Sequence, residues 1–311
     1  MVFSPIDVRV REVGLRDGLQ MIAAQVPTEV KIDWLRAEFA AGVREMEVTS
    51  LVPAKLMPQF ADAQAVIEAA KALPGLTTVA LVPNLKGAQR ALELGVDKLD
   101  FVMSVSRTHN LKNVRRPREE SLADLVRIVH ERDAAGLKGK VLISAGLSSA
   151  LGCSYEGQIE VDEVRRCAAD LVAAGAEEVL VADTVGYSNP QKVEEVFRAV
   201  MRETGDLPVG AHLHDTRGLG IANAKAAFDC GVRLFDASLG GLGGCPHSPG
   251  ASGNVVMEDL CFLFESMGLR TGIDLVALLE VRRQVAAALG DVPMFGALSR
   301  AGLPTGHHAA A

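Results

Sequence analysis

Short apolar runs alternate with longer amphipathic stretches along nearly the whole chain. The apolar runs predict eight β-strands, at residues 8–13, 43–49, 77–82, 98–103, 140–144, 178–182, 209–214 and 234–238. The stretches between them repeat apolar residues at the helical period, and several end in a glycine just before the next run, as at Gly42 and Gly95. This order of elements predicts an α/β protein with a parallel sheet covered by helices.

The number and spacing of the repeats predict a closed (β/α)8 barrel, a TIM barrel, that spans residues 1–311 as one domain. The main alternative is an open, doubly wound sheet, which would carry a GxGxxG fingerprint after its first strand. The segment 14–20 reads GLRDGLQ instead, which favours the barrel. Two helical stretches follow the last strand, at 255–266 and 274–288, and the second predicts an extra C-terminal helix. The tail at 302–311 is expected to be disordered.

Composition and charge argue against several classes of protein. Apolar residues make up 49% of the chain and aromatic residues only 4%, as in parallel strands buried on both faces by small aliphatic side chains. The net charge of -7 makes nucleic acid an unsuitable main partner. The five cysteines form no CxxC pair, which favours a reducing compartment. Without a signal-like segment or a run of about 20 apolar residues, a cytoplasmic protein that does not enter the membrane is expected.

Polar and ionisable residues gather where the predicted strands end, which is where barrels of this kind build their active sites. They are Arg16, Asp17, Glu47, Asp183, His212, His214, Asp215, Cys245 and Asn254. Since side chains alternate along a strand, His212 and His214 are expected to point the same way. Each residue also has an ordinary explanation, because Asp183 and Asp215 could simply cap the following helices. Convergence of the whole set at one rim favours a functional site.

Asp17, His212, His214 and Asn254 together offer two nitrogens and two oxygens to a cation. Hard oxygen ligands suit Mg²⁺ or Mn²⁺, and imidazole also accepts Zn²⁺, Co²⁺ or Fe²⁺. Arg16 would add a fixed positive charge beside the metal that can stabilise an enolate. These residue types therefore predict a metal-assisted reaction in which negative charge develops on oxygen.

Cys245 lies in the glycine-rich segment 240–246, which is expected to close over a substrate. A thiol in that position could donate a proton, and the alternative is a buried packing residue. The basic stretch 112–118 is either a solvated loop or a contact for the phosphates of a nucleotide-bearing substrate. His109 and His130 are expected at the surface.

These motifs resemble those of the 3-hydroxy-3-methylglutaryl-CoA lyases, a family of the DRE-TIM metallolyase superfamily. The resemblance rests on residues 12–20, 83–87, 150–157, 183–186, 212–216, 241–246 and 250–254. It implies a retro-Claisen cleavage of 3-hydroxy-3-methylglutaryl-CoA, an acyl-CoA of the kind met in leucine degradation, to acetyl-CoA and acetoacetate. It also implies Mg²⁺ or Mn²⁺ as the cofactor and a homodimer as the assembly.

The resemblance further implies roles for individual residues. The metal ligands are matched by Asp17, His212, His214 and Asn254. Arg16 matches the arginine that stabilises the enolate, and Cys245 matches the acid that protonates the acetyl-CoA carbanion. Asp183 and Glu47 match further active-site acids, and either Asp183 or His212 could take the proton of the substrate hydroxyl.

The chain departs from the family pattern in places that could contact substrate. Met21, Ile22 and Ala23 follow Gln20 where the family has Asn-Glu-Lys, and Gly146 stands where it has tyrosine. Loss of an aromatic ring would enlarge the pocket, so a longer 3-hydroxyacyl-CoA is an alternative substrate. Two rival functions are a Claisen-condensing synthase of the isopropylmalate or homocitrate type, against which Cys245 argues, and a non-catalytic metal-binding barrel.

Overall fold

The computed structural model describes residues 6–23, 25–244 and 253–307. Its strands are β1 (Arg9–Glu12), β2 (Glu45–Ser50), β3 (Thr77–Val82), β4 (Lys98–Ser104), β5 (Leu142–Ser148), β6 (Glu178–Asp183), β7 (Val209–Leu213) and β8 (Leu234–Ala237). Its α-helices are α1 (Thr28–Ala40), α2 (Ala63–Lys71), α3 (Leu85–Leu94), α4 (Arg107–Asn113), α5 (Arg118–Ala134), α6 (Val161–Ala173), α7 (Pro190–Thr204), α8 (Gly220–Asp229), α9 (Met257–Ser266), α10 (Leu275–Leu289) and α11 (Leu298–Ala301). Three short helical turns complete the set, η1 (Gly14–Gly18), η2 (Pro58–Phe60) and η3 (Leu239–Gly241).

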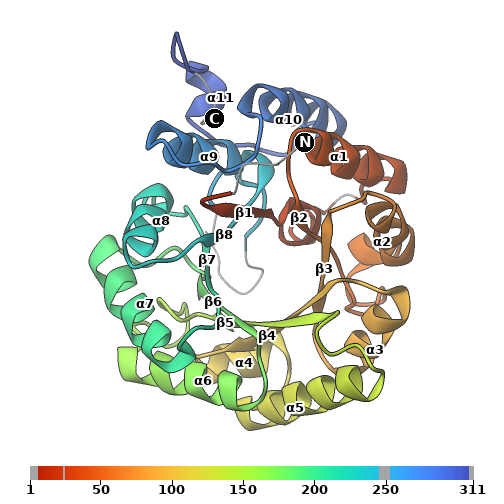
Figure 1. Ribbon diagram of the computed structural model, residues 1–311, viewed down its shortest axis with the longest axis vertical. Coiled ribbons are helices and arrows are strands. Elements are labelled where there is room, and N and C mark those ends of the chain that lie inside the picture. The colour runs from red at the N-terminus through yellow and green to blue at the C-terminus, as the bar shows by residue number, and fades with distance from the viewer. Residues whose placement is uncertain (1–5, 24, 245–252, 308–311) are drawn as a thin grey trace.

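The strands form a closed parallel barrel in chain order, because β1 pairs with both β2 and β8. The α-helices surround the barrel as an outer ring (Figure 1). The predicted (β/α)8 barrel is confirmed, and closure through β1 and β8 rules out the open sheet. Helix α10 is the predicted extra helix, and the short α11 follows it.

Side-chain alternation divides the buried strand residues into two sets with different chemistry. Residues that point outward, such as Phe101, Leu147 and Phe235, pack with the surrounding helices in the hydrophobic core. At the N-terminal end of the barrel interior, Lys98 Nζ lies 2.6 Å from Glu45 Oε1 and 2.7 Å from Glu178 Oε2. Since the apolar core lies between sheet and helices, the barrel interior is free to hold charged groups that face one another.

Strand β5 continues four residues beyond the predicted end at residue 144. The apolar pattern breaks at Ser144 and Gly146 because these residues face the barrel interior, whereas Ala145 and Leu147 face the helices and are fully buried. The extension matters for function because it turns Gly146 into a wall residue of the cavity described below.

The connection after β4 also differs from the expectation. It contains the helix α4, which begins at a Ser106 cap whose hydroxyl accepts from the His109 amide at 3.0 Å. His109 was expected at the surface, but only 1% of it is exposed, and its Nδ1 lies 2.7 Å from Ser104 Oγ. His130 is exposed as predicted.

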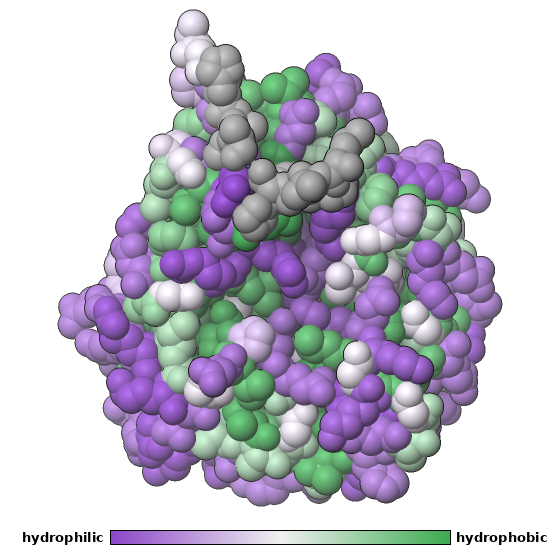
Figure 2. All heavy atoms as spheres, viewed as in Figure 1, coloured by the Kyte–Doolittle hydropathy of each residue, from purple (hydrophilic) through white to green (hydrophobic). Residues whose placement is uncertain are grey.

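In the space-filling view, hydrophilic and apolar residues are interspersed over the described part of this face, without one broad apolar area (Figure 2). Of the tail predicted to be disordered, Leu303 packs against the core, and residues 308–311 lie outside the described residues. Within the described ranges, no helix combines the length and the apolar character that a membrane span needs.

Candidate active site

A π-helical turn, η1, follows β1 directly and carries Arg16 and Asp17. The Asp17 amide donates to the Val13 carbonyl at 2.7 Å, which tightens the chain at the mouth of the barrel. A Cβ on Gly14 would lie 2.8 Å from the Trp34 ring, so only glycine fits there. Turns of this kind are rare in helices and concentrate at functional sites.

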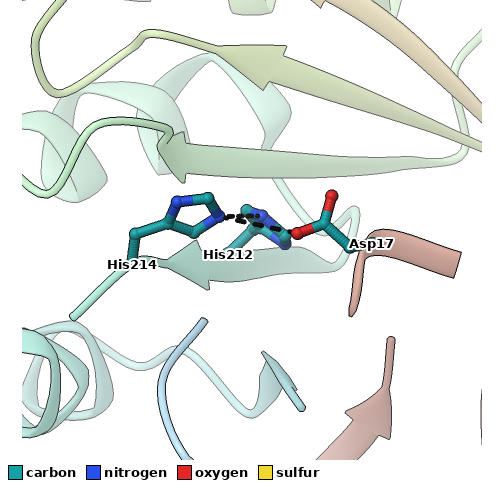
Figure 3. A group of neighbouring side chains, drawn as sticks. All are labelled: Asp17, His212 and His214. Carbon is teal, nitrogen blue, oxygen red and sulfur yellow. Dashed lines mark hydrogen bonds and ion pairs between the residues drawn. The ribbon is translucent and has the colours of Figure 1, made fainter. Parts of the chain in front are cut away.

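Three side chains converge in front of this turn (Figure 3). The Nε2 atoms of His212 and His214 lie 3.1 Å apart, and His214 Nε2 lies 3.7 Å from Asp17 Oδ2. One donor atom from each residue falls within 4.8 Å of the other two. The predicted common orientation of the two histidines is confirmed, and a possible metal site is present where the sequence placed it.

Asn254 lies beside the group, since it bridges to His214 through the backbone. Its Nδ2 donates to Asp17 Oδ2 at 2.8 Å and to the Leu242 carbonyl at 2.9 Å. Its Oδ1 is buried and has no hydrogen-bond partner among the described residues. A buried amide oxygen without a partner, next to a carboxylate and two imidazoles, is a further candidate oxygen ligand.

The histidine pair has the electrostatics of a site that exchanges protons for a cation. Burial lowers the pKa of His212, but the Asp236 and Asp17 carboxylates outweigh it and raise that pKa above its usual value. Burial and the neighbouring His212 lower the pKa of His214 to about 4. The two Nε2 atoms lie 3.1 Å apart, so one cation could accept a lone pair from each and displace bound protons. The residues therefore fit a divalent metal.

Arg16 is fixed between two carboxylates. Its Nε donates to Glu47 Oε2 and its Nη1 to Asp17 Oδ1, both at 2.6 Å. Burial alone would raise the pKa of Asp17, but Arg16 and the two histidines lower it below its usual value. Burial raises the pKa of Glu47 to about 8, with Asp100 adding to the rise and Arg16 opposing it. The cavity thus presents a guanidinium whose Nη2 makes no hydrogen bond to the described residues.

An ion pair that the sequence analysis missed orients His212. Asp236 Oδ2 lies 3.0 Å from His212 Nδ1, and both Asp236 oxygens accept from Arg11 at 2.7 Å. Arg11 is fully buried and Asp236 is 2% exposed. The sequence does carry a signal for this pair, because Arg11 and Asp236 are charged residues in the middle of two strands that are expected to be buried. A carboxylate on the far nitrogen fixes the tautomer that leaves Nε2 free to bind a metal.

Asp183 is not among the residues that line the cavity. Because Ala182 points into the barrel, Asp183 points away from it. Its carboxylate accepts from the amides of Tyr187 and Ser188 at 2.9 and 3.0 Å, and burial raises its pKa. The carboxylate therefore holds the turn that precedes α7, whose N-cap is Asn189, and this favours a structural role over the predicted catalytic one. Asp215 behaves in the same way, since it accepts from the Gly220 amide at 2.7 Å.

The cavity has a volume of about 720 Å³. It runs from Asp17, His212 and His214, here called the Asp17 group, to an opening lined by basic side chains, here called the basic mouth. Lys112, Arg115 and Arg116 line the mouth, and Lys112 Nζ lies 4.2 Å from the centre of the Tyr155 ring. The basic stretch 112–118 therefore borders the cavity, which is the position that a contact with substrate phosphates would require.

Cys245 lies outside the described residues, but the segment that leads to it is placed. Gly243 has φ 129°, and a Cβ there would lie 2.3 Å from Asn254 Nδ2 and 2.9 Å from Asp17 Oδ2. Only glycine allows the backbone to pass this close to the donor group. Gly244, the last described residue before this gap, lines the cavity.

Comparison with known proteins shows the family to which this chain belongs. The HMGL-like family model matches residues 7–285. Hydroxymethylglutaryl-CoA lyase YngG of Bacillus subtilis (strain 168) is 37% identical over 286 residues, which cover 92% of this chain and 94% of that protein. The mitochondrial hydroxymethylglutaryl-CoA lyase of Gallus gallus is 37% identical over 288 residues, with coverage of 92% and 94%. The structure of an HMG-CoA lyase from Acinetobacter baumannii, in complex with coenzyme A and 3-methylmalate, is 38% identical, covers 97% of each chain and superposes with a TM-score of 0.90.

Proposed function

Since the chain belongs to the HMGL-like family, we propose that it is a metal-dependent carbon–carbon lyase that cleaves 3-hydroxy-3-methylglutaryl-CoA to acetyl-CoA and acetoacetate. The observation that carries the proposal is the convergence of Asp17, His212 and His214 in a cavity that Arg16 also lines. The relatives named above are hydroxymethylglutaryl-CoA lyases, and the match covers almost their whole length. This agrees with the lyase class that the motifs predict.

Asp17, His212, His214 and Asn254 would hold the metal, and their mixture of oxygen and imidazole ligands suits Mg²⁺ or Mn²⁺. A divalent cation in this place supplies Lewis-acid polarisation of substrate oxygens. Asp236 supports the arrangement because it holds His212 Nδ1. Besides offering its oxygen to the metal, Asn254 donates from its amide nitrogen to the Asp17 carboxylate and holds that ligand in position.

The reaction needs a base, an anion-stabilising group and an acid. A base removes the proton of the C3 hydroxyl, the C2–C3 bond breaks, and its electron pair becomes the enolate of the acetyl thioester while C3 becomes the ketone carbon of acetoacetate. Of the two predicted bases, only His212 lines the cavity. Because Asp236 holds Nδ1, Nε2 carries the free lone pair of His212, and this lone pair could accept the proton only while it does not bind a metal.

Arg16 is suited to stabilise the enolate. The hydrogen bonds to Glu47 and Asp17 use Nε and Nη1, so Nη2 stays available to substrate. The same bonds immobilise the guanidinium before substrate binds. Preorganised donors of this kind stabilise developing charge without reorganisation. Protonation at C2 would complete the reaction, and we assign that step to Cys245 on the family motif.

The basic mouth suits the coenzyme A end of the substrate. Lys112, Arg115 and Arg116 line it together, and phosphate groups are the anions that clustered cationic side chains bind. Substrate would therefore lie with its phosphates at α4 and its acyl group at the Asp17 group.

A product assay tests the proposal. Protein loaded with Mn²⁺ is given 3-hydroxy-3-methylglutaryl-CoA, and acetyl-CoA and acetoacetate are both quantified. Equal amounts of the two products are expected, with loss of turnover in Asp17→Asn and wild-type turnover in Asp274→Asn, a matched change at an exposed helix cap. Release of free coenzyme A from acetyl-CoA and a 2-oxoacid would point instead to the condensing synthase, and metal binding without turnover of any thioester to the non-catalytic barrel.

Two expectations stay predictions: a homodimer, which the family resemblance implies, and a cytoplasmic location, which the sequence suggests. Light scattering on the purified protein measures the first, and fractionation of cells that express it measures the second.

A further inference from the structure

We propose that this chain prefers, over the methyl substrate, thioesters whose C3 carries a longer aliphatic group, which lies against an apolar wall centred on Gly146. The inference rests on the proposed function and names its substrate class, the coenzyme A thioesters of 3-hydroxy-3-alkylglutarates.

The wall is formed by neighbouring strands in register. Gly146 on β5 pairs with Val102 on β4 and with Leu180 on β6, and all three residues line the cavity. Ala182 continues the wall and pairs with His212 on β7. Residues paired in register point to the same side of a sheet, so the wall runs without interruption up to the candidate metal ligand.

Gly146 leaves space in this wall that packing does not require. A Cβ there would meet only Val102 Cγ2 at 3.6 Å and the Phe101 carbonyl at 3.7 Å, which are ordinary contacts. Gly210, also on a barrel strand, is the contrasting case, because a Cβ there would lie 2.4 Å from Leu180 Cδ2. Gly210 is therefore needed for the barrel to close around Leu180, whereas the space beside Gly146 opens into the cavity.

The chemistry of the substrate decides what fills this space. Four groups are attached to C3 of such a thioester: the hydroxyl, the thioester arm, the carboxylate arm and the alkyl substituent. In the proposed binding mode, the hydroxyl lies at the Asp17 group and the thioester arm extends past Arg16 to the basic mouth, and all of these residues line the cavity. Of the four, only the substituent needs no polar partner, and Val102, Gly146, Leu180 and Ala182 offer no side-chain donor or acceptor. A methyl group covers little of this wall, whereas a longer chain removes more apolar surface from water.

Steady-state kinetics with two substrates tests the inference. Mn²⁺-loaded wild-type protein is given 3-hydroxy-3-methylglutaryl-CoA and, in parallel, 3-butyl-3-hydroxyglutaryl-CoA. Burial of three further methylenes predicts a kcat/KM at least about tenfold higher for the butyl substrate. Most of the gain is expected in KM, because the chain is buried equally in the ground state and the transition state.

The outcomes separate the two proposals. Cleavage of the methyl substrate with an equal or higher kcat/KM than the butyl substrate would overturn the inference and leave the proposed function in place. Cleavage of neither substrate would overturn the proposed function, and the inference with it.

Variants locate the binding surface. Gly146→Leu should lower the ratio of butyl to methyl kcat/KM at least about tenfold, and Gly146→Ala should lower it less. Ala65→Leu adds similar bulk to an exposed position on α2 and should keep the wild-type ratio. Val102→Phe fills the same space from β4 and replaces Gly146→Leu if that variant does not fold. An unchanged ratio in a folded variant of either kind would overturn the assignment of this wall.

Discussion

Replacement of Asp236 by asparagine should weaken metal binding and stability by separate routes. Asp236 accepts from His212 Nδ1 and from two nitrogens of the fully buried Arg11. Although burial opposes it, Arg11 and His212 hold the pKa of Asp236 well below its usual range. Asp236→Asn keeps the shape of the side chain and removes this charge.

The two magnitudes follow from the contacts. Loss of a carboxylate that orients a ligating histidine typically costs about 10- to 100-fold in metal affinity, which is about 1.4–2.7 kcal/mol. Removal of one partner of a buried ion pair costs about 3–5 kcal/mol. The lower end is expected here because Asp100 Oδ2 still lies 3.7 Å from Arg11 Nη2. A second variant, Arg11→Met with Asp236→Asn, leaves no unpaired cation and should regain much of the stability without regaining the affinity.

Two assays read the two effects. The dissociation constant for Mn²⁺ is measured by electron paramagnetic resonance on metal-free protein, and the free energy of unfolding by urea titration. Asp274→Asn at the exposed α10 cap is the matched control and should change neither by more than its error. An Asp236→Asn protein that binds Mn²⁺ within about threefold of wild type would refute the positioning of His212 by Asp236.

Other parts of the molecule yield predictions that do not depend on Asp236. Glu38→Gln should reduce the loss of stability that occurs as pH rises from 5 to 8, because Glu12 alone then contributes to it. Burial raises the pKa of Glu38 well above its usual range and that of neighbouring Glu12 to about 8, so the folded state retains protons that the unfolded chain has released. Melting temperatures across this range check it, and an unchanged pH dependence would contradict it. Lys98→Met leaves the buried Glu178 carboxylate unpaired and Glu45 with Arg9 alone, and should cost about 3–5 kcal/mol in urea. Arg9→Met, at an exposed side chain, should cost under about 1 kcal/mol. Equal losses would contradict the difference. Lys112→Ala should raise KM for the thioester about fivefold and leave kcat unchanged, which initial rates measure, and a fall in kcat alone would exclude a binding role.

The fold was predictable because its signals are local and repeated. Each strand carries apolar residues that face the helices, and most helices end next to a glycine, so the sequence contains the barrel's period even though no single element proves closure. The end of β5 was not predictable in the same way. Ser144 and Gly146 face the interior, where polarity and size follow the needs of the cavity, and only the neighbouring strands reveal which residues face it.

The site was predictable where its residues lie at strand ends, and less so elsewhere. Asp17, His212 and His214 were identified from their place at the rim, and the structure brings them together. Arg11 and Asp236 lie mid-strand on β1 and β8, the pair that closes the barrel, so their contact depends on tertiary structure. Asp183 shows that a polar residue at a strand end can also serve the turn that follows it, which the sequence alone does not distinguish from a catalytic role.

The most direct test of the account is a joint titration of metal binding and turnover. Protein freed of metal with EDTA receives increasing Mn²⁺, bound Mn²⁺ is followed by electron paramagnetic resonance, and acetyl-CoA formation from 3-hydroxy-3-methylglutaryl-CoA is followed in the same samples. The account predicts that both rise together and level at about one Mn²⁺ per chain, and that His214→Gln weakens both. Full turnover by metal-free protein, or unchanged Mn²⁺ binding in His214→Gln, would contradict it.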